Sequence, residues 1–323
     1  NNFSFVYQIR QLVNQQEQTI MTIENLAQIN KTLWSPDQSQ IIVWATEKNS
    51  SNTSPQKFII NINQQTISKS TIPSDNIAWT PDSQHIYYVF SDIKTVDEQP
   101  PSDLPEGAGW VPTISFGTNN NMLTSANPDG SNWQNIIKLD EHNIFDPILV
   151  PSPDNNYIII ISNNHQVYIF DRQNNIVNQF ATSESVTDAS WSPDSQKILL
   201  ETYNEKYNPQ LVLTALNSNT NQSTNIQTFL SKSTWMNDHE LICAIPNYLE
   251  QGPYSELPST IDYFKIIDFN QPSNNTDYPY STTQLNNTNQ VANTAIDLSF
   301  NTNNNSLYYI DYDDILYFIP KTN

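Results

Sequence analysis

The strongest constraint on the fold of this chain is a short phrase that recurs along it: an aromatic residue, then Ser or Thr, Pro and Asp. Three copies are complete, one keeps Ser-Pro-Asp without the aromatic residue, and two weaker copies lack the proline. The six copies begin at Trp34, Trp79, Pro151, Trp191, Trp235 and Phe300. Such repetition predicts that one supersecondary unit is used repeatedly.

The spacing and chemistry of the phrase identify this unit. Successive copies begin 45, 72, 40, 44 and 65 residues apart, and the short spacings match the roughly 40–45 residues of a four-stranded propeller blade. Proline favours the second position of a type I turn, and Asp accepts a hydrogen bond from a nearby backbone N–H. Apolar runs such as Ile41–Trp44 and Ile158–Ile161 follow, which predicts strands buried on both faces. We therefore predict an all-β fold, a six-bladed β-propeller of four-stranded antiparallel blades.

In these residues the chain resembles the TolB-type, WD40-like β-propeller repeat family, whose phrase is Trp-Ser-Pro-Asp-Gly followed by a strand. The resemblance covers residues 29 to 318, but the glycine of the family is replaced in this chain. The replacements are Gln38, Ser83, Asn155 and Ser195. Because Ser and Gln suit a left-handed backbone less well than Gly does, we expect some turns to be displaced by a residue. A glycine remains in Asn127–Gly130, where we expect the turn between the third and outermost strands of blade two.

The repeats predict one propeller domain over residues 1–323, with blades that start near the six phrases. We expect long loops at residues 91–120 in blade two and 246–260 in blade five, each between the second and third strands. Propellers often close their ring with a terminal strand. We expect Thr19–Ile23 to supply the outer strand of the last blade, and Phe3–Tyr7 to be an extra strand or a tether.

Charge limits the choice of partners. The chain has 13 Lys and Arg against 33 Asp and Glu, a net charge of −20. Nucleic acid and anionic membranes are therefore excluded as expected partners, because both require basic patches. No window approaches 18 consecutive apolar residues, so we expect no membrane insertion within this chain. A protein partner that carries basic groups fits the charge.

The compartment is inferred less directly. The single cysteine, Cys243, excludes an intrachain disulfide, and its apolar neighbours predict a buried position in a strand. Because the chain begins at Asn1 rather than Met, we expect that an upstream segment was removed or is not included. Members of the resembled family are commonly envelope or exported proteins. The resemblance therefore implies an extracytoplasmic location: periplasmic, cell-surface or secreted.

The two long loops are the predicted functional site. In a six-bladed ring, blades two and five lie opposite each other, so we expect both loops to meet over the mouth of the central channel, near an acidic link between blades. Neutral insertion is the alternative, since long surface loops cost little stability. The predicted partner-binding residues on these loops and this link are Trp110, Tyr248, Tyr254, Asp103, Glu106 and His142.

Signals for catalysis and cofactors are poor. With five glycines there is no Gly-rich phosphate loop, and no Gly-x-Ser-x-Gly elbow is present, so we predict neither an enzyme nor a cofactor. The four histidines have no metal-like spacing. Asp311, Asp313 and Asp314 are weak candidates for calcium, because the remaining ligands of a dedicated loop are missing.

We therefore predict a non-catalytic recognition scaffold for another protein at the bacterial cell envelope or surface. A carbohydrate- or small-ligand-binding or enzymatic propeller, which would use acids at the channel mouth and His142, is one alternative. A structural subunit of a surface assembly is another. The sequence leaves the identity of the partner and the oligomeric state open.

Overall fold

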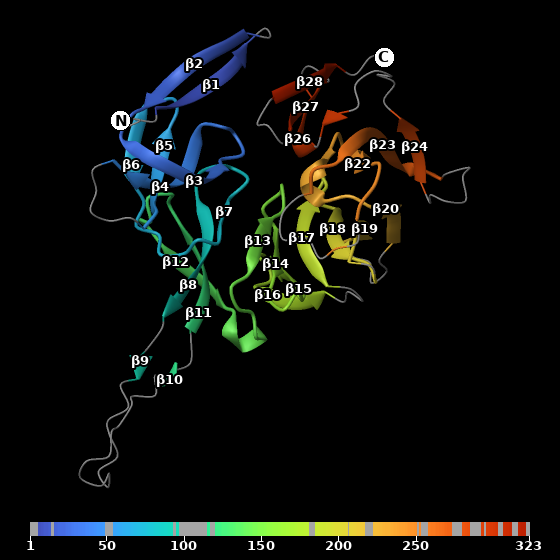
Figure 1. Ribbon diagram of the computed structural model, residues 1–323. Coiled ribbons are helices and arrows are strands. Elements are labelled where there is room, and N and C mark those ends of the chain that lie inside the picture. Colours follow the sequence, from blue (N-terminus) through green and yellow to red (C-terminus); the bar gives the residue numbers. More distant parts are fainter. Residues whose placement is uncertain are drawn as a thin grey trace, which may run out of the picture. The chain divides into compact units, whose positions relative to one another are not determined.

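The computed structural model contains β-strands and two short 3₁₀ turns (Figure 1). It describes residues 6–13, 16–48, 54–92, 95–96, 115–116, 120–180, 185–205, 207–216, 222–250, 252, 258–272, 280–284, 292–293, 295–302, 306–311 and 316–320. No helix in this part of the chain is long and apolar enough to span a bilayer. The chain divides into two compact units, Asn1–Pro151 and Ser152–Asn323.

Unit one begins with a hairpin and holds the first two blades. The hairpin joins β1 (Tyr7–Val13) to β2 (Gln16–Ile23). Blade one has the order β3-β4-β5-β6, with bounds Leu26–Trp34, Gln40–Glu47, Gln56–Asn61 and Thr66–Lys69. Blade two has the order β12-β11-β8-β7, with bounds Gln134–Lys138, Asn120–Ala126, Ile86–Asp92 and Ile77–Trp79.

Between β8 and β11, a two-residue ladder pairs β9 (Thr95–Val96) with β10 (Ser115–Phe116). After β12, the chain forms the 3₁₀ turn η1 (Asp140–His142) and then β13 (Ile148–Pro151). The predicted turn around Gly130 lies between the third and fourth strands of blade two, as expected, with Gly130 at a φ of 89°.

Unit two contains the remaining strands, from β14 onward. Blade three has the order β13-β14-β15-β16, the last three being Tyr157–Ile161, Val167–Asp171 and Ile176–Phe180. Blade four has the order β17-β18-β19-β20: Val186–Trp191, Lys197–Tyr203, Pro209–Ala215 and Gln222–Ile226. The 3₁₀ turn η2 (Leu230–Lys232) leads to blade five.

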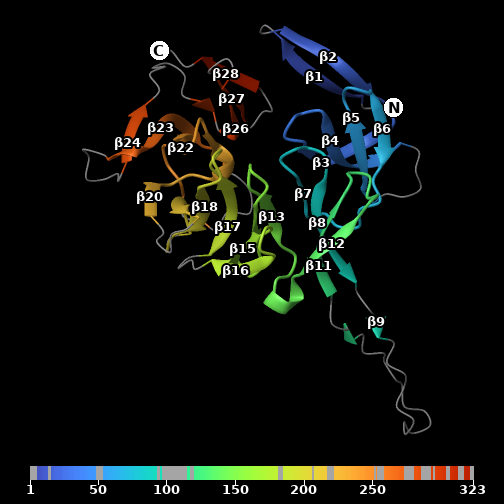
Figure 2. The same cartoon turned by 180° about the vertical axis from the view of Figure 1, so that it is seen from behind.

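Blade five has the order β21-β22-β23-β24: Ser233–Trp235, Glu240–Pro246, Ile261–Pro272 and Tyr280–Gln284. The short β25 (Ala292–Asn293) also pairs with β23. The last sheet is β26-β27-β28: Ala295–Asn301, Ser306–Asp311 and Leu316–Pro320. Figure 2 shows the strands of blades four and five from behind, each set side by side.

The prediction of six four-stranded blades closed by an N-terminal strand is wrong. The fold is an all-β propeller with five blades, and the described part of the last sheet has three strands. Residues 19–23 belong to β2, which pairs with β1 over its whole length instead of joining that sheet. Pairing of β2 with β1 is favoured over pairing with the last sheet for two reasons. The hairpin closes a short loop, and Ile9 and Ile23 are buried against Leu26 and Ile41 of blade one.

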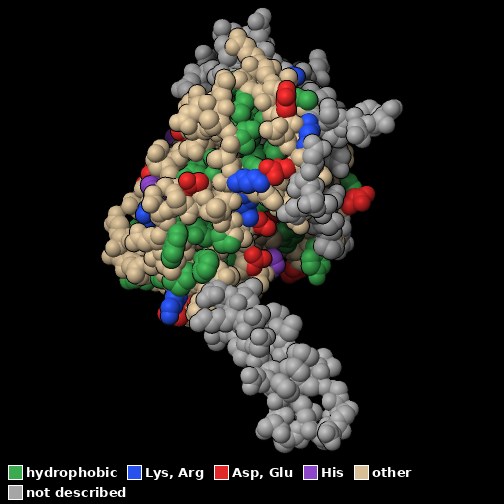
Figure 3. Space-filling view, turned by 90° about the vertical axis from the view of Figure 1, so that its left-hand side faces the viewer, with side chains coloured by type: hydrophobic (Ala, Val, Ile, Leu, Met, Phe, Trp, Pro, Cys, Tyr) green, Lys and Arg blue, Asp and Glu red, His purple; other side chains and the backbone are tan. Residues whose placement is uncertain are grey.

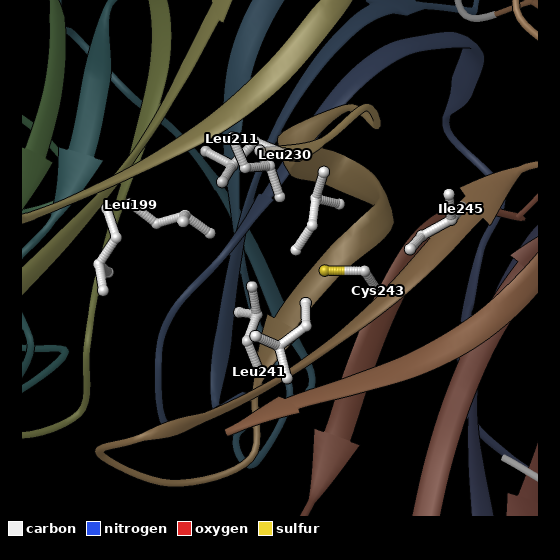
Figure 4. Packing of buried hydrophobic residues seen from close by; sticks show 9 residues of the cluster. Leu199, Leu211, Leu230, Leu241, Cys243 and Ile245 are labelled. Atoms are coloured by element: carbon white, nitrogen blue, oxygen red, sulfur yellow. The ribbon is translucent and has the colours of Figure 1, made fainter. Parts of the chain in front are cut away.

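The strands that follow the turn phrases are buried on both faces, as predicted. In β22, Leu241, Cys243 and Ile245 face a cluster that blade four shares, whereas Ile242 and Ala244 pack toward the last sheet. Figure 4 shows the first cluster, in which leucines from both blades surround Cys243. Side chains alternate along a strand, so each sheet contributes to two apolar interfaces. Burial of Cys243 raises the pKa of its thiol.

The turn phrases have the same conformation in all four Pro-containing copies. The residues that replace the family's glycine have φ values of 58–61°, and the N–H of each donates to the carbonyl three residues earlier. The expected displacement of these turns is therefore wrong. In the first turn the Ser35 hydroxyl and the Ser39 N–H donate to the Asp37 carboxylate, at 2.7 and 3.0 Å. These bonds lower the pKa of Asp37 to about 2.

Two of these replacement residues link neighbouring blades. Ser83 and Ser195 are fully buried, although their backbones are left-handed. The Ser83 hydroxyl accepts the N–H of Asp37 at 3.0 Å, and the Ser195 hydroxyl accepts that of Asp154 at 3.1 Å. The turn of one blade thus holds the turn of the preceding blade. Glycine has the easier backbone but offers no such acceptor.

Two substitutions at Ser195 separate the hydrogen bond from the backbone effect. Ser195→Ala removes the acceptor and keeps the left-handed Cβ, so it should lower the free energy of unfolding by about 1–2 kcal/mol. Ser195→Gly removes both the acceptor and the Cβ. Because the strain of the left-handed Cβ is relieved, the free energy of unfolding should fall by less than about 1 kcal/mol. Urea unfolding measures both, with exposed Ser231→Ala as the control. An unchanged midpoint for Ser195→Ala would show that the link contributes nothing.

Candidate functional site

The loop inserted in blade five starts from firmly paired strand ends. β22 and β23 are antiparallel partners up to Pro246 and Asp262. One step further, the Asn247 N–H donates to the Ile261 carbonyl at 2.8 Å. Residues next to these ends therefore have defined positions.

A pocket of about 390 Å³ lies at this stem, between the end of β20 and the adjoining ends of β22 and β23. Its lining residues are Asn225, Ile226, Gln227, Ile245, Pro246, Asn247, Tyr248, Leu249 and Tyr263. None is an acid or a base apart from the tyrosine phenols. The Tyr248 side chain is 73% exposed beside the pocket, and Gln227 and Asn247 are also exposed.

The lining suits a neutral ligand. Ile226 and Ile245 are buried in the core, so the accessible lining is mostly polar, with carboxamides that both donate and accept hydrogen bonds beside the exposed Tyr248 ring. A charged ligand group would meet no counter-charge in this lining. The pocket can therefore bind an uncharged polar group that offers both donors and acceptors, with ring contact from Tyr248.

A buried ion pair anchors the same stem. Lys232 and Asp262 are both fully buried, with Nζ and Oδ2 2.9 Å apart. The Lys232 Nζ also donates to the Thr260 hydroxyl at 2.8 Å, and that hydroxyl donates to Asp262 Oδ1 at 2.6 Å. The Ala295 N–H donates to Asp262 Oδ2 at 2.8 Å. This network ties the link before blade five, the end of the insertion and the start of the last sheet together.

Burial dominates the electrostatics of Lys232. Desolvation lowers the pKa of its ammonium group, and the Asp262 carboxylate opposes that shift. Removing either partner would leave an uncompensated buried charge. Because Asp262 is the cross-strand partner of Pro246, which lines the pocket, we assign this network a role in positioning these strand ends.

A second feature is a pair of carboxyl groups in blade four, of which Glu201 is buried and Asp188 is partly buried. Asp188 on β17 and Glu201 on β18 are direct cross-strand partners. Glu201 accepts the Thr187 hydroxyl at 2.9 Å and the Leu230 N–H at 2.7 Å. Burial, with a smaller effect from the Glu201 charge, raises the pKa of Asp188 to about 6 despite the hydrogen bond from the Ala189 N–H. Sequence reasoning missed this pair; the available signal was an acid within each of two successive strand segments, Val186–Trp191 and Lys197–Tyr203.

Of the predicted partner-binding residues, the structure places Tyr248 at the pocket. Trp110, Tyr254, Asp103 and Glu106 lie outside the described residues, so their grouping stays a prediction. His142 ends η1 in unit one, where its backbone N–H donates to the Leu139 carbonyl at 3.0 Å.

The metal candidates gain no support. Asp311 is the last residue of β27, and Asp313 and Asp314 lie outside the described residues. Across the residues described above, no three His, Cys, Asp or Glu side chains are grouped as metal ligands would be.

The Asp188 carboxyl should make stability depend on pH. A raised folded-state pKa means that stability is greatest below the unfolded value of 3.8 and is lost as pH rises through about 6. Asp188→Asn should therefore raise the free energy of unfolding by about 1–3 kcal/mol at pH 7.5, and by little at pH 4. Urea titrations at both pH values measure the difference, with exposed Asp238→Asn as the control. An equal effect at both pH values would contradict the assignment.

Comparison with known proteins supports the fold. No family model and no curated protein matches the chain. The TolB-type family predicted from the turn phrases is therefore not confirmed. Among solved structures, TolB from Acinetobacter baumannii is 15% identical, with a TM-score of 0.48. That match covers 83% of this chain, which spans 56% of that TolB chain.

Two further structures are more similar in shape. An oligogalacturonate lyase in complex with manganese has a TM-score of 0.53 at 11% identity, covering 94% of this chain and 80% of its own. Kuenenia stuttgartiensis hydrazine synthase has a TM-score of 0.50 at 12% identity, covering 86% and 72%. At such identities the likeness extends to the fold alone, which is that of a β-propeller.

Proposed function

We propose that this chain is a non-catalytic recognition module that binds a protein partner at the stem of the blade-five insertion. The observation that carries the proposal is the uncharged pocket flanked by the exposed Tyr248 ring. Tyrosines at the centre of an interface often contribute much of its binding energy, because the ring loses its water on binding and the phenol still finds a hydrogen-bond partner.

The composition of the site favours a protein ligand. Tyrosine and asparagine are among the side chains enriched in antibody loops: the ring supplies rigid contact area, and the amide supplies adaptable hydrogen bonds. On the face of unit one that Figure 3 shows, both acidic and basic side chains are present. The net charge of −20 would still steer a partner with basic groups toward the molecule. The proposed extracytoplasmic location rests on the resemblance of the turn phrases alone.

Rigid anchoring also supports binding at this place. The pocket wall is continuous with paired strands, and Asp262 of the buried ion pair is the cross-strand partner of Pro246 in that wall. A site held by buried contacts loses less conformational entropy when a ligand binds.

Capture from an envelope extract tests the proposal. Tyr248→Ala should weaken capture of the specific partner about tenfold or more, because a central anchor contributes 2 kcal/mol or more. Trp133→Ala is the control, since Trp133 is 62% exposed and belongs to unit one. Partner retention is quantified by mass spectrometry against wild type.

Two outcomes would contradict the proposal. Equal capture by wild type and Tyr248→Ala would remove the pocket as the binding site. Release of soluble fragments from an envelope polysaccharide by the purified chain would show that the protein is an enzyme.

A further inference from the structure

The link between blades four and five, residues 227–232, is attached to blade four by the carboxylate of Glu201. The Leu230 N–H, in η2, donates to Glu201 Oε2 at 2.7 Å, and both residues are buried. The Thr187 hydroxyl, on β17, donates to Glu201 Oε1 at 2.9 Å. The two oxygens of one side chain therefore hold η2 against the first two strands of blade four.

On its other side, the link is bonded to blade five. The Thr228 hydroxyl donates to the Ala244 carbonyl at 2.6 Å, and Lys232 Nζ lies 2.9 Å from Asp262 Oδ2. Neither of these two bonds involves blade four. Separation of η2 from blade four can therefore leave both of them intact.

Asp188 makes this separation depend on charge. It is the cross-strand partner of Glu201, so both side chains project from the same face of the sheet, and its strand, β17, contacts η2. An ionised Asp188 in this partly buried position lacks full hydration and lies opposite a second carboxylate. Both penalties raise the pKa of Asp188 to about 6, burial being the larger cause. Opening of the junction relieves both.

The basic groups nearby are engaged elsewhere. Besides Glu201, the titratable side chains on the elements that contact β17, and in the turn beside its start, are Tyr157, His165, Lys197, Tyr203 and Lys232. Lys197 pairs with the Asp of its own turn, and Lys232 pairs with Asp262. His165 Nδ1 lies 3.2 Å from the Val186 carbonyl. Asp188 is therefore left to hydration and protonation.

We propose that this junction is a pH-dependent latch: η2 stays bonded to blade four while Asp188 is protonated and separates from it more often when Asp188 is ionised. Because the folded-state pKa is raised, the closed junction is most populated below 3.8 and is lost as pH rises through about 6. The inference does not depend on the proposed function, but it bears on the same site, since Gln227 at the start of the link lines the pocket.

Hydrogen exchange of the Leu230 amide, followed by NMR on the whole chain, tests this inference. Where exchange reports the open population, wild type and Asp188→Asn compared at one pH differ in how often this amide is released. The ratio of the wild-type rate to the Asp188→Asn rate should rise about tenfold between pH 5 and pH 7.5, levelling off above pH 6. Asp188→Ser should give the same rise. Exposed Asp238→Asn, the control, should change the rate less than twofold at either pH.

Amides of the core strands provide the reference for complete unfolding. The Leu230 amide should exchange faster than the slowest amides of β14 and β15. If it exchanged as slowly as they do, η2 would be released only on complete unfolding, and the latch would not exist as a separate element. An equal ratio at both pH values, or a Leu230 rate that neither Asp188 variant changes, would also overturn the inference. None of these results would affect the proposed function, which Tyr248→Ala tests.

Discussion

The hydrogen bond between successive turns is the constraint on which the blades depend. A single four-stranded sheet exposes two apolar faces and is stable only when its neighbours cover them. The hydroxyls of Ser83 and Ser195 fix that neighbour relation by accepting an N–H from the preceding turn. In unit one, Trp79 adds a second bond, because its Nε1 donates to the Leu33 carbonyl at 3.1 Å. Serine thus occupies a backbone conformation that suits glycine, and it supplies a hydroxyl acceptor that glycine lacks.

The proposed site follows from the same two-sided burial. β22 is held by apolar contacts on both faces, so the ends of this strand and its partner are well placed to carry a loop. Lys232 and Asp262 form a buried ion pair at the strand ends that carry the pocket, and no carboxylate, Lys or Arg lines the pocket itself. Strand ends held in this way lose less conformational entropy when a ligand binds.

The predictability of these features depends on how local their causes are. The turns, the strand runs, buried Cys243 and exposed Tyr248 follow from short stretches of sequence, and the structure has them in place. Blade number depends on what β2 pairs with, and apolar residues such as Ile23 suit either sheet. Lys232 and Asp262 are 30 residues apart, and alone each resembles an ordinary surface charge.

The solitary thiol of Cys243 has a consequence for the behaviour of the folded molecule. It is enclosed by leucines of blades four and five, and burial keeps it protonated as well as inaccessible (Figure 4). Thiol reagents attack the thiolate, so alkylation has to wait until these two sheets separate. The rate at which Cys243 is alkylated in the folded protein therefore reports how often the interface between blades four and five opens.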